Sequence, residues 1–217
     1  MLCKKRWLCA LVLTAASAHA QEVREYSVDA AKSDIHWLVF KAGSLSRLGH
    51  NHVVSVADLT GSVTLNRADP TKSRFELQFP VASLVVDDPK LRAGLGADFS
   101  SVPSADDIAG TRKNMLGEKV LDADDHETIR VTGMGPSGQG DAQTMKITVE
   151  LLGRSVDLTV PTKVTIDGNV LSASGEFDLT HTALGMMPFS VMLGALQVAD
   201  GMKFVYNVHA DAATAAH

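Results

Sequence analysis

Apolar and polar residues alternate along most of the chain, with the period of two that is typical of strands with one buried face. Turn signals separate the alternating stretches, and Asp167-Gly168-Asn169 predicts a tight hairpin. Short links of this kind favour antiparallel pairing. We therefore expect about eight antiparallel strands. Their apolar faces include Ile35, Trp37 and Val39; Leu59, Val63 and Leu65; Phe75, Leu77, Phe79 and Val81; Ile129 and Val131; Met145, Ile147, Val149 and Leu151; Val156, Leu158 and Val160; Leu171, Ala173, Phe177 and Leu179; and Met202, Phe204, Tyr206 and Val208.

One segment departs from this alternation and predicts a short helix. Ser104 followed by Asp107 resembles a capping box, and apolar residues follow it as far as Leu116, just before Gly117. The fold class is therefore all-β with one short helix. Such strands hide an apolar face either between two packed sheets or inside one sheet closed as a barrel, and the pattern alone leaves both open.

The N-terminus has the features of a cleavable signal peptide. Lys4, Lys5 and Arg6 precede an apolar stretch over residues 7–16, and Ala18-His19-Ala20 fits the small-x-small cleavage pattern. The apolar stretch is too short to span a bilayer. We divide the chain into a signal peptide at residues 1–20, one β-barrel domain at residues 21–210 and a frayed tail at residues 211–217, and we expect an exported, periplasmic protein without stable membrane insertion.

Composition narrows the chemistry of the mature domain. Cys3 and Cys9, the two cysteines of the chain, fall in the expected signal peptide, so the domain has neither a disulfide nor a cysteine metal site. The formal net charge is −5, and cleavage would remove three basic residues and no acidic one. An acidic surface of this kind repels phosphate backbones and anionic membranes, which argues against a nucleic-acid partner. Aromatic residues make up only 5% of the chain, so an interior cavity would be largely aliphatic and suited to a flexible hydrocarbon.

Five segments resemble the YceI-like family of periplasmic lipid- and polyisoprenoid-binding proteins. They are YSVDAAKSDIHWLV (residues 26–39), NMLGEKVLDADDHETIRV (114–131), LLGRSVDLTV (151–160), SASGEFDL (172–179) and LGALQVADGMKF (193–204). The resemblance implies an extended lipocalin-like antiparallel barrel with a helix beside it, around a tunnel for an isoprenoid or fatty-acyl chain. The expected ligand-binding residues are Ile35, Trp37, Val39, Val63, Phe75, Leu77, Val131, Ile147, Val149, Phe177, Leu193, Leu196 and Phe204.

The sequence departs from the family pattern at two places. Where many members place a basic residue after the SASG-type strand, this chain has Asp178-Leu179-Thr180-His181, which argues against a pyrophosphate headgroup. The second place is Leu48-Gly49-His50-Asn51-His52. Histidines at i and i+2 of a strand share a face and could hold zinc, copper or nickel, with His181 as a third ligand if its strand continues.

The strand register around the two histidines has two solutions. Counting back from Leu59 turns Asn51 and Val53 inward, whereas counting back from Val54 and Val56 turns His50 and His52 inward. A bulge near Ser55 would decide between them. In the inward register the histidines could equally form a polar lining at the mouth of a lipid cavity.

No motif predicts catalysis, because the chain has no Gly-x-Ser-x-Gly elbow and its mature part has no cysteine nucleophile. The acidic pairs Asp87-Asp88, Asp106-Asp107 and Asp124-Asp125 fall in expected loops. The leading hypothesis is a non-enzymatic periplasmic carrier that needs no cofactor. The alternative is a periplasmic metal-binding or metal-dependent redox protein that uses the His50-Asn51-His52 cluster. The oligomeric state stays open, and an open edge at an imperfect barrel closure would allow a homodimer.

Overall fold

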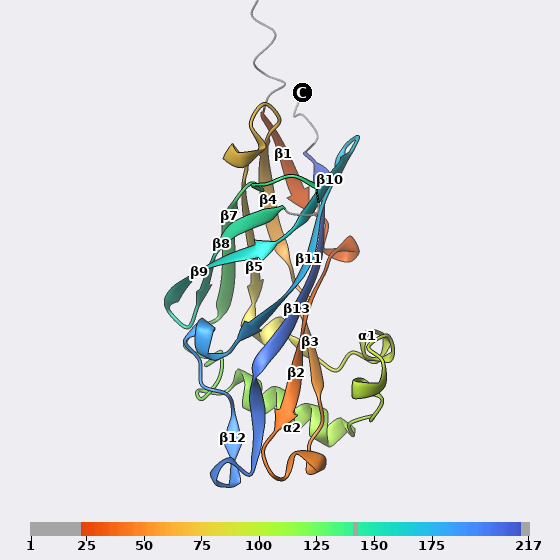
Figure 1. Ribbon diagram of the computed structural model, residues 1–217, viewed down its shortest axis with the longest axis vertical. Coiled ribbons are helices and arrows are strands. Elements are labelled where there is room, and N and C mark those ends of the chain that lie inside the picture. The colour runs from red at the N-terminus through yellow and green to blue at the C-terminus, as the bar shows by residue number, and fades with distance from the viewer. Residues whose placement is uncertain (1–22, 141–142, 214–217) are drawn as a thin grey trace, which may run out of the picture.

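The computed structural model describes residues 23–140 and 143–213, so the expected signal peptide lies outside the described residues. Figure 1 shows an elongated body of long strands with helices at the lower end. The strands are β1 (Val23–Val28), β2 (Asp34–Ala42), β3 (His52–Ser55), β4 (Thr60–Asn66), β5 (Arg74–Pro80), β6 (Val85–Val86), β7 (Thr128–Met134), β8 (Thr144–Leu151), β9 (Arg154–Pro161), β10 (Lys163–Asp167), β11 (Val170–Thr180), β12 (Ser190–Val191) and β13 (Leu196–Ala212).

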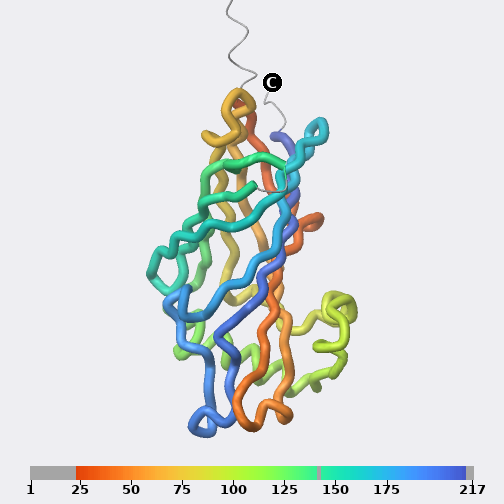
Figure 2. The backbone as a smooth tube through the Cα atoms, viewed as in Figure 1, coloured from red at the N-terminus to blue at the C-terminus, as the bar shows by residue number. Residues whose placement is uncertain are grey.

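Every strand pair in the sheet is antiparallel, as the short links predicted. The main path runs β6-β3-β2-β13-β1-β4-β5-β7-β8-β9, and β13 also pairs with β11 and β12. β10 pairs with β11, and Gly168 and Asn169 form the two-residue turn of the predicted hairpin. β13 is the longest strand and lies at the centre of the sheet, where the tube in Figure 2 crosses the length of the molecule.

Two parts of the predicted fold class need correction. The described residues form thirteen strands in place of about eight, and their ladders do not close the sheet into a barrel. The path of ladders breaks after β9, which ends at Pro161. Pro161 has no backbone N–H, and the N–H of the next residue, Thr162, donates to the carbonyl of Gln143 on the β8 side, 2.9 Å away. Tyr206 on β13 still reaches this break, since its hydroxyl donates to the Pro161 carbonyl at 2.7 Å. β13 also continues to Ala212, two residues past the expected end of the domain.

The predicted helix is confirmed as α2 (Ala105–Leu116), with Ser104 as its N-cap and Asp107 completing the capping box. Its apolar residues Ile108, Met115 and Leu116 pack against the main core. A second helix, α1 (Pro89–Ala93), begins where Asp88 caps the amides of Lys90 and Leu91. Short 3-10 turns lie at Ala30–Lys32, Ser46–Leu48, Pro70–Lys72, Val81–Ser83, Ala97–Phe99, Thr182–Leu184 and Met192–Gly194.

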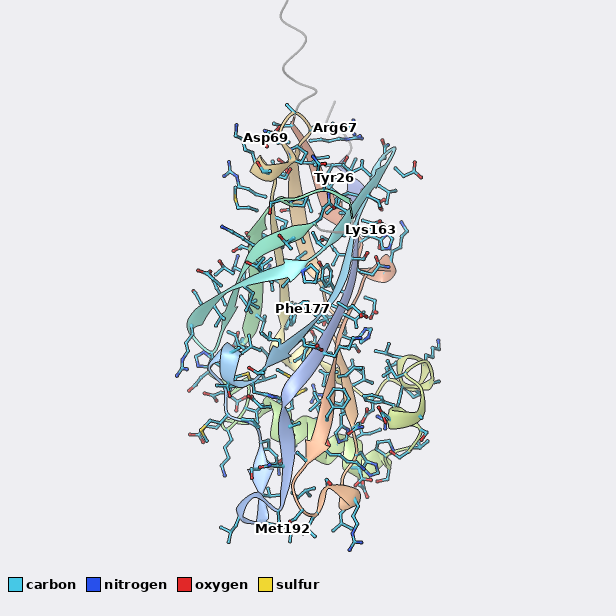
Figure 3. All side chains as sticks on the ribbon, viewed as in Figure 1. Tyr26, Arg67, Asp69, Lys163, Phe177 and Met192 are labelled. Carbon is cyan, nitrogen blue, oxygen red and sulfur yellow. The ribbon has the colours of Figure 1, made fainter. Side chains whose placement is uncertain are left out.

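The apolar core has two parts along the long axis. The main cluster extends from β3, β5 and β6 to Leu184 and Met202, and α2 packs against it. A smaller cluster of Tyr26, Leu65, Leu171 and Ala210 joins β1, β4, β11 and β13 near the upper end, where Figure 3 labels Tyr26. No helix among the described residues combines the length and apolar character needed to cross a membrane.

Candidate functional site

A cavity of about 910 Å³ runs through the inside of the curved sheet. Its wall draws residues from β2 through β5, from β7 through β13 and from α2, so the sheet surrounds it even though the ladders do not close. On β13 the lining extends from Leu196 to Val208, which at roughly 3.3 Å per residue corresponds to about 40 Å. The volume lies near the upper end of the roughly 300–1,000 Å³ usual for ligand pockets.

A row of aromatic rings crosses the middle of the cavity wall. Phe204 on β13 is paired with Trp37 on β2 and with Phe177 on β11. Its ring is stacked on both neighbours, with centroid distances of 5.5 Å to Trp37 and 5.4 Å to Phe177. Phe177 is labelled at mid-height in Figure 3. The stacked rings give this part of the wall a flat, rigid apolar surface.

The structure places almost the whole predicted set of ligand-binding residues on this wall. The residues that line the cavity are Ile35, Trp37, Val39, Val63, Phe75, Leu77, Val131, Ile147, Val149, Phe177, Leu196 and Phe204. That they touch a ligand stays a prediction.

Leu193 is the exception, and its predicted inward position is wrong. The side chain is fully exposed, at 109% of the reference area. The prediction came with the family resemblance, whose last segment starts at Leu193, but β13 begins only at Leu196. Leu193 lies instead in a 3-10 turn with a φ of 55°, which turns its side chain outward.

The structure selects the register that turns the histidines inward. His52 is the first residue of β3 and lines the cavity together with Val54, while His50 lies in the segment before the strand. The two rings are 6.2 Å apart. The Nδ1 atom of His52 is 2.6 Å from Oδ2 of Asp87, and its Nε2 atom is 3.4 Å from the Thr111 hydroxyl on α2. Because the ionised carboxylate can only accept, Nδ1 carries the proton and donates, which leaves Nε2 of a neutral ring as an acceptor facing α2.

Behind His52 lies a buried ion pair that the sequence did not reveal. The side chain of Asp87 has no exposed area, and its Oδ1 accepts from the Arg92 guanidinium at 2.6 Å and from the Val53 amide at 3.0 Å. Arg92 on α1 also donates to the carbonyls of Asn51 and Ser101. Burial raises the pKa of the Asp87 carboxyl, but the hydrogen bonds from His52 and the Val53 amide and the charge of Arg92 outweigh it, so that its pKa lies below the ordinary value.

Asp87 and Asp88 lie in the link between β6 and α1, as expected, but the other acidic pair of this region lies in a helix and not in the expected loop. Asp106 and Asp107 are in the first turn of α2. Asp107 lines the cavity, and its Oδ2 is 3.8 Å from Nε2 of His50. Hydrogen bonds from the Ser104 hydroxyl and amide lower the pKa of the Asp107 carboxyl. This end of the cavity therefore carries imidazole, hydroxyl and carboxylate groups on an otherwise apolar wall.

The three predicted metal ligands do not form a metal site. β11 ends at Thr180, and His181 is the N-cap of the 3-10 turn at Thr182–Leu184. Its Nδ1 atom is 3.0 Å from the backbone carbonyl of Asp200. His50, His52 and His181 all line the same long cavity. Among the described residues, no group of three or more His, Cys, Asp or Glu side chains is arranged to hold a metal ion.

Sequence reasoning missed Asp87, Arg92 and Thr111 for different reasons. Asp88 followed by Pro89 is the signature of a helix start, and it could have placed Asp87 beside a folded segment. A lone arginine or threonine carries no comparable signal. Arg92 is buried where α1 folds back towards the start of β3, and it contacts Asn51, which lies 41 positions earlier in the chain.

The fold and the cavity define a β-rich binding protein with a long apolar interior. The YceI-like domain family matches residues 26–210, and the chain belongs to this family, whose fold is a ligand-binding one. No curated protein matches the chain by sequence.

Two solved structures have a similar fold. Burkholderia cenocepacia BcnA is 15% identical, with a TM-score of 0.60 over 86% of this chain and 99% of its own. The Campylobacter jejuni YCEI protein is 10% identical, with a TM-score of 0.51 over 74% and 85% of the two chains.

Proposed function

We propose that this protein is a non-enzymatic periplasmic carrier that holds one isoprenoid or fatty-acyl chain in its cavity. The observation that carries the proposal is the length and apolar lining of the cavity. A hydrocarbon chain gains about 0.8 kcal/mol for each CH₂ group that it buries, which offsets the entropy lost on ordering the chain.

The dimensions of the cavity favour a long chain. One acyl chain of a membrane lipid spans about half of the roughly 30 Å hydrocarbon core of a bilayer. The lining of β13 alone extends for about 40 Å. A polyprenyl chain or a very long acyl chain fits this length better than an ordinary fatty acid does.

The polar groups around His52 support a role in holding the head of the ligand. Nε2 of a neutral His52 accepts a hydrogen bond, and the nearby Asp107 carboxylate repels anions. A hydroxyl or an amide head suits this end of the cavity better than a phosphate does. The absence of a third metal ligand among the described residues leaves the metal-binding alternative without support from the geometry.

A variant that fills the cavity tests the proposal. Val149 lines the cavity on β8, whereas Lys146 on the same strand is exposed. We expect Val149→Trp to weaken binding of a fluorescent polyene fatty acid, measured by titration, by at least about tenfold, since the indole occupies the space of the chain. Lys146→Trp adds the same ring outside the cavity and should bind as the wild type does.

Native mass spectrometry of gently purified protein gives a second reading. We expect a lipid adduct on the wild type and its loss in Val149→Trp. A wild-type protein that carries no adduct and takes up neither prenyl nor acyl probes would overturn the proposed function.

A further inference from the structure

Two short loops meet at the lower end of the molecule and form what we call the lower tip, residues 45–49 and 190–196. The Leu45 amide donates to the Ala195 carbonyl at 2.8 Å, and a Cβ atom on Gly43 would lie only 2.5 Å from the same oxygen. Val191 pairs with Leu196 at the base of the second loop. Figure 3 labels Met192 at the very end of the body.

The lower tip exposes large apolar side chains. The exposed fractions are 67% for Leu48, 39% for Val191, 66% for Met192 and 109% for Leu193. Apolar side chains scattered singly over a surface need no explanation, but four on two touching loops form a patch of the kind that marks an interaction site.

The backbone of the lower tip is strained in a way that presents these side chains. Met192 and Leu193 are consecutive and have φ values of 51° and 55°, in the left-handed region that bulky residues rarely adopt. Glycine or asparagine would adopt this conformation more easily. Both side chains point into solvent, so burial in the fold does not offset the backbone strain at these two positions.

The lower tip also borders the cavity. Leu48, Gly49, Val191, Leu196 and Gln197 all line it, so the exposed residues continue directly into its wall. An apolar chain that entered between the two loops would pass from one apolar surface to the next.

The charge around the lower tip differs from that of the rest of the protein. The whole chain has a net charge of −5, but residues 182–199 contain no charged residue. In the first loop Arg47 is exposed and carries the charge, and Lys41 nearby donates to the Gly49 carbonyl at 2.9 Å. A neutral-to-basic apolar patch on an acidic protein suits an anionic lipid surface.

We propose that the lower tip docks reversibly on the surface of a lipid bilayer, with Met192 and Leu193 among the lipid acyl chains. Docking would let the carried chain pass between membrane and cavity without crossing water, and in this sense the proposal rests on the proposed function. A stable protein partner would need about 800 Å² and 20–30 residues on each side. The lower tip offers four exposed apolar side chains on two short loops.

Vesicle flotation with the exported chain tests the proposal. The vesicles contain phosphatidylethanolamine and phosphatidylglycerol. We expect the wild type to float with them and Met192→Asn/Leu193→Asn to lose at least about tenfold in partitioning. Asparagine tolerates the left-handed conformation, so the variant should keep its fold and its thermal midpoint. The matched control is Val102→Asn, an 86% exposed residue outside the lower tip, which should partition as the wild type does.

Three results separate the possible outcomes. Equal partitioning of wild type and double variant, or no partitioning of the wild type, would overturn docking on a bilayer. A wild-type dimer in sedimentation that the double variant abolishes would also overturn it, because a second copy would then cover the lower tip. The double variant should take up a detergent-dispersed acyl probe as the wild type does. If the wild type does not take up this probe, the result counts against the proposed function, whereas the flotation result still tests docking by itself.

Discussion

The two ends of the molecule bury different kinds of groups. At the upper end, Tyr26, Leu65, Leu171 and Ala210 pack as a small cluster with at most 5% exposure each. At the lower end the core contains the charged pair Asp87 and Arg92, and large apolar residues lie outside in solvent. The upper cluster is therefore built from apolar and aromatic side chains alone, whereas the lower part combines the main apolar cluster with a buried ion pair. The cavity reaches both ends, but its histidine, hydroxyl and carboxylate groups lie at the lower end. This difference is the basis for the two proposals made above, a ligand head held near His52 and a membrane contact at the lower tip.

The largest effect should come from removing the charge of Asp87. Asp87→Asn leaves the Arg92 guanidinium buried without a counter-charge, and we expect a loss of about 3–5 kcal/mol in the free energy of unfolding, measured by urea denaturation. Asparagine accepts the φ of 55° at this position, so the backbone should not confound the result. Asp34 on β2 is the matched control, because it also contacts a histidine: its Oδ2 atom is 2.8 Å from Nδ1 of His36, but its side chain is half exposed. Asp34→Asn should cost less than about 1 kcal/mol.

The pH dependence of stability gives an independent check on Asp87. Its pKa is lower in the folded than in the unfolded state, where an aspartate titrates near 3.9. Its contribution is therefore complete above about pH 4 and is lost as the pH falls through the folded pKa. The wild type should lose stability more steeply than Asp87→Asn below pH 4. Parallel curves for the two proteins would contradict the assigned pKa direction.

A cavity-forming substitution at the upper end should have the next largest effect. Leu171 is 5% exposed in the upper cluster, so Leu171→Ala should cost about 3 kcal/mol in thermal or urea unfolding. Leu196→Ala at the lower mouth removes the same atoms from a half-buried position, so a smaller loss of about 1 kcal/mol is expected. Equal costs would mean that the two ends are packed alike.

The smallest effect concerns the hydroxyl of Tyr26. Among the described residues this buried group has no hydrogen-bond partner, so Tyr26→Phe should leave the free energy of unfolding unchanged or raise it by about 1 kcal/mol. Tyr206→Phe is the matched control, because the Tyr206 hydroxyl donates to the Pro161 carbonyl and its loss should cost about 1 kcal/mol. A clear destabilisation in Tyr26→Phe would reveal a partner for its hydroxyl.

The alternating stretches predicted from the sequence coincide with long strands, and their apolar sides with the cavity wall, because both depend on local alternation, although the count of about eight strands is too low. Trp37, Phe177 and Phe204 each belong to the apolar set of alternate residues on their strand, so all three side chains lie on the face that lines the cavity. The prediction fails where the local period ends. Leu193 lies in a strained turn before β13, and His181 follows the end of β11. The Asp87–Arg92 pair depends on where α1 folds relative to β3, which no periodicity records.

The position of β13 also has a consequence for how the chain folds. This strand follows every other described element, and it pairs with β1, β2, β11 and β12. Tyr26 and Ala212, from opposite ends of the described chain, are direct partners. Contacts of such sequence separation form slowly, because a long loop must close before they are made. The central ladder can therefore form only after almost the whole chain is available, whereas the local pairs β4–β5, β7–β8 and β8–β9 do not have to wait for β13.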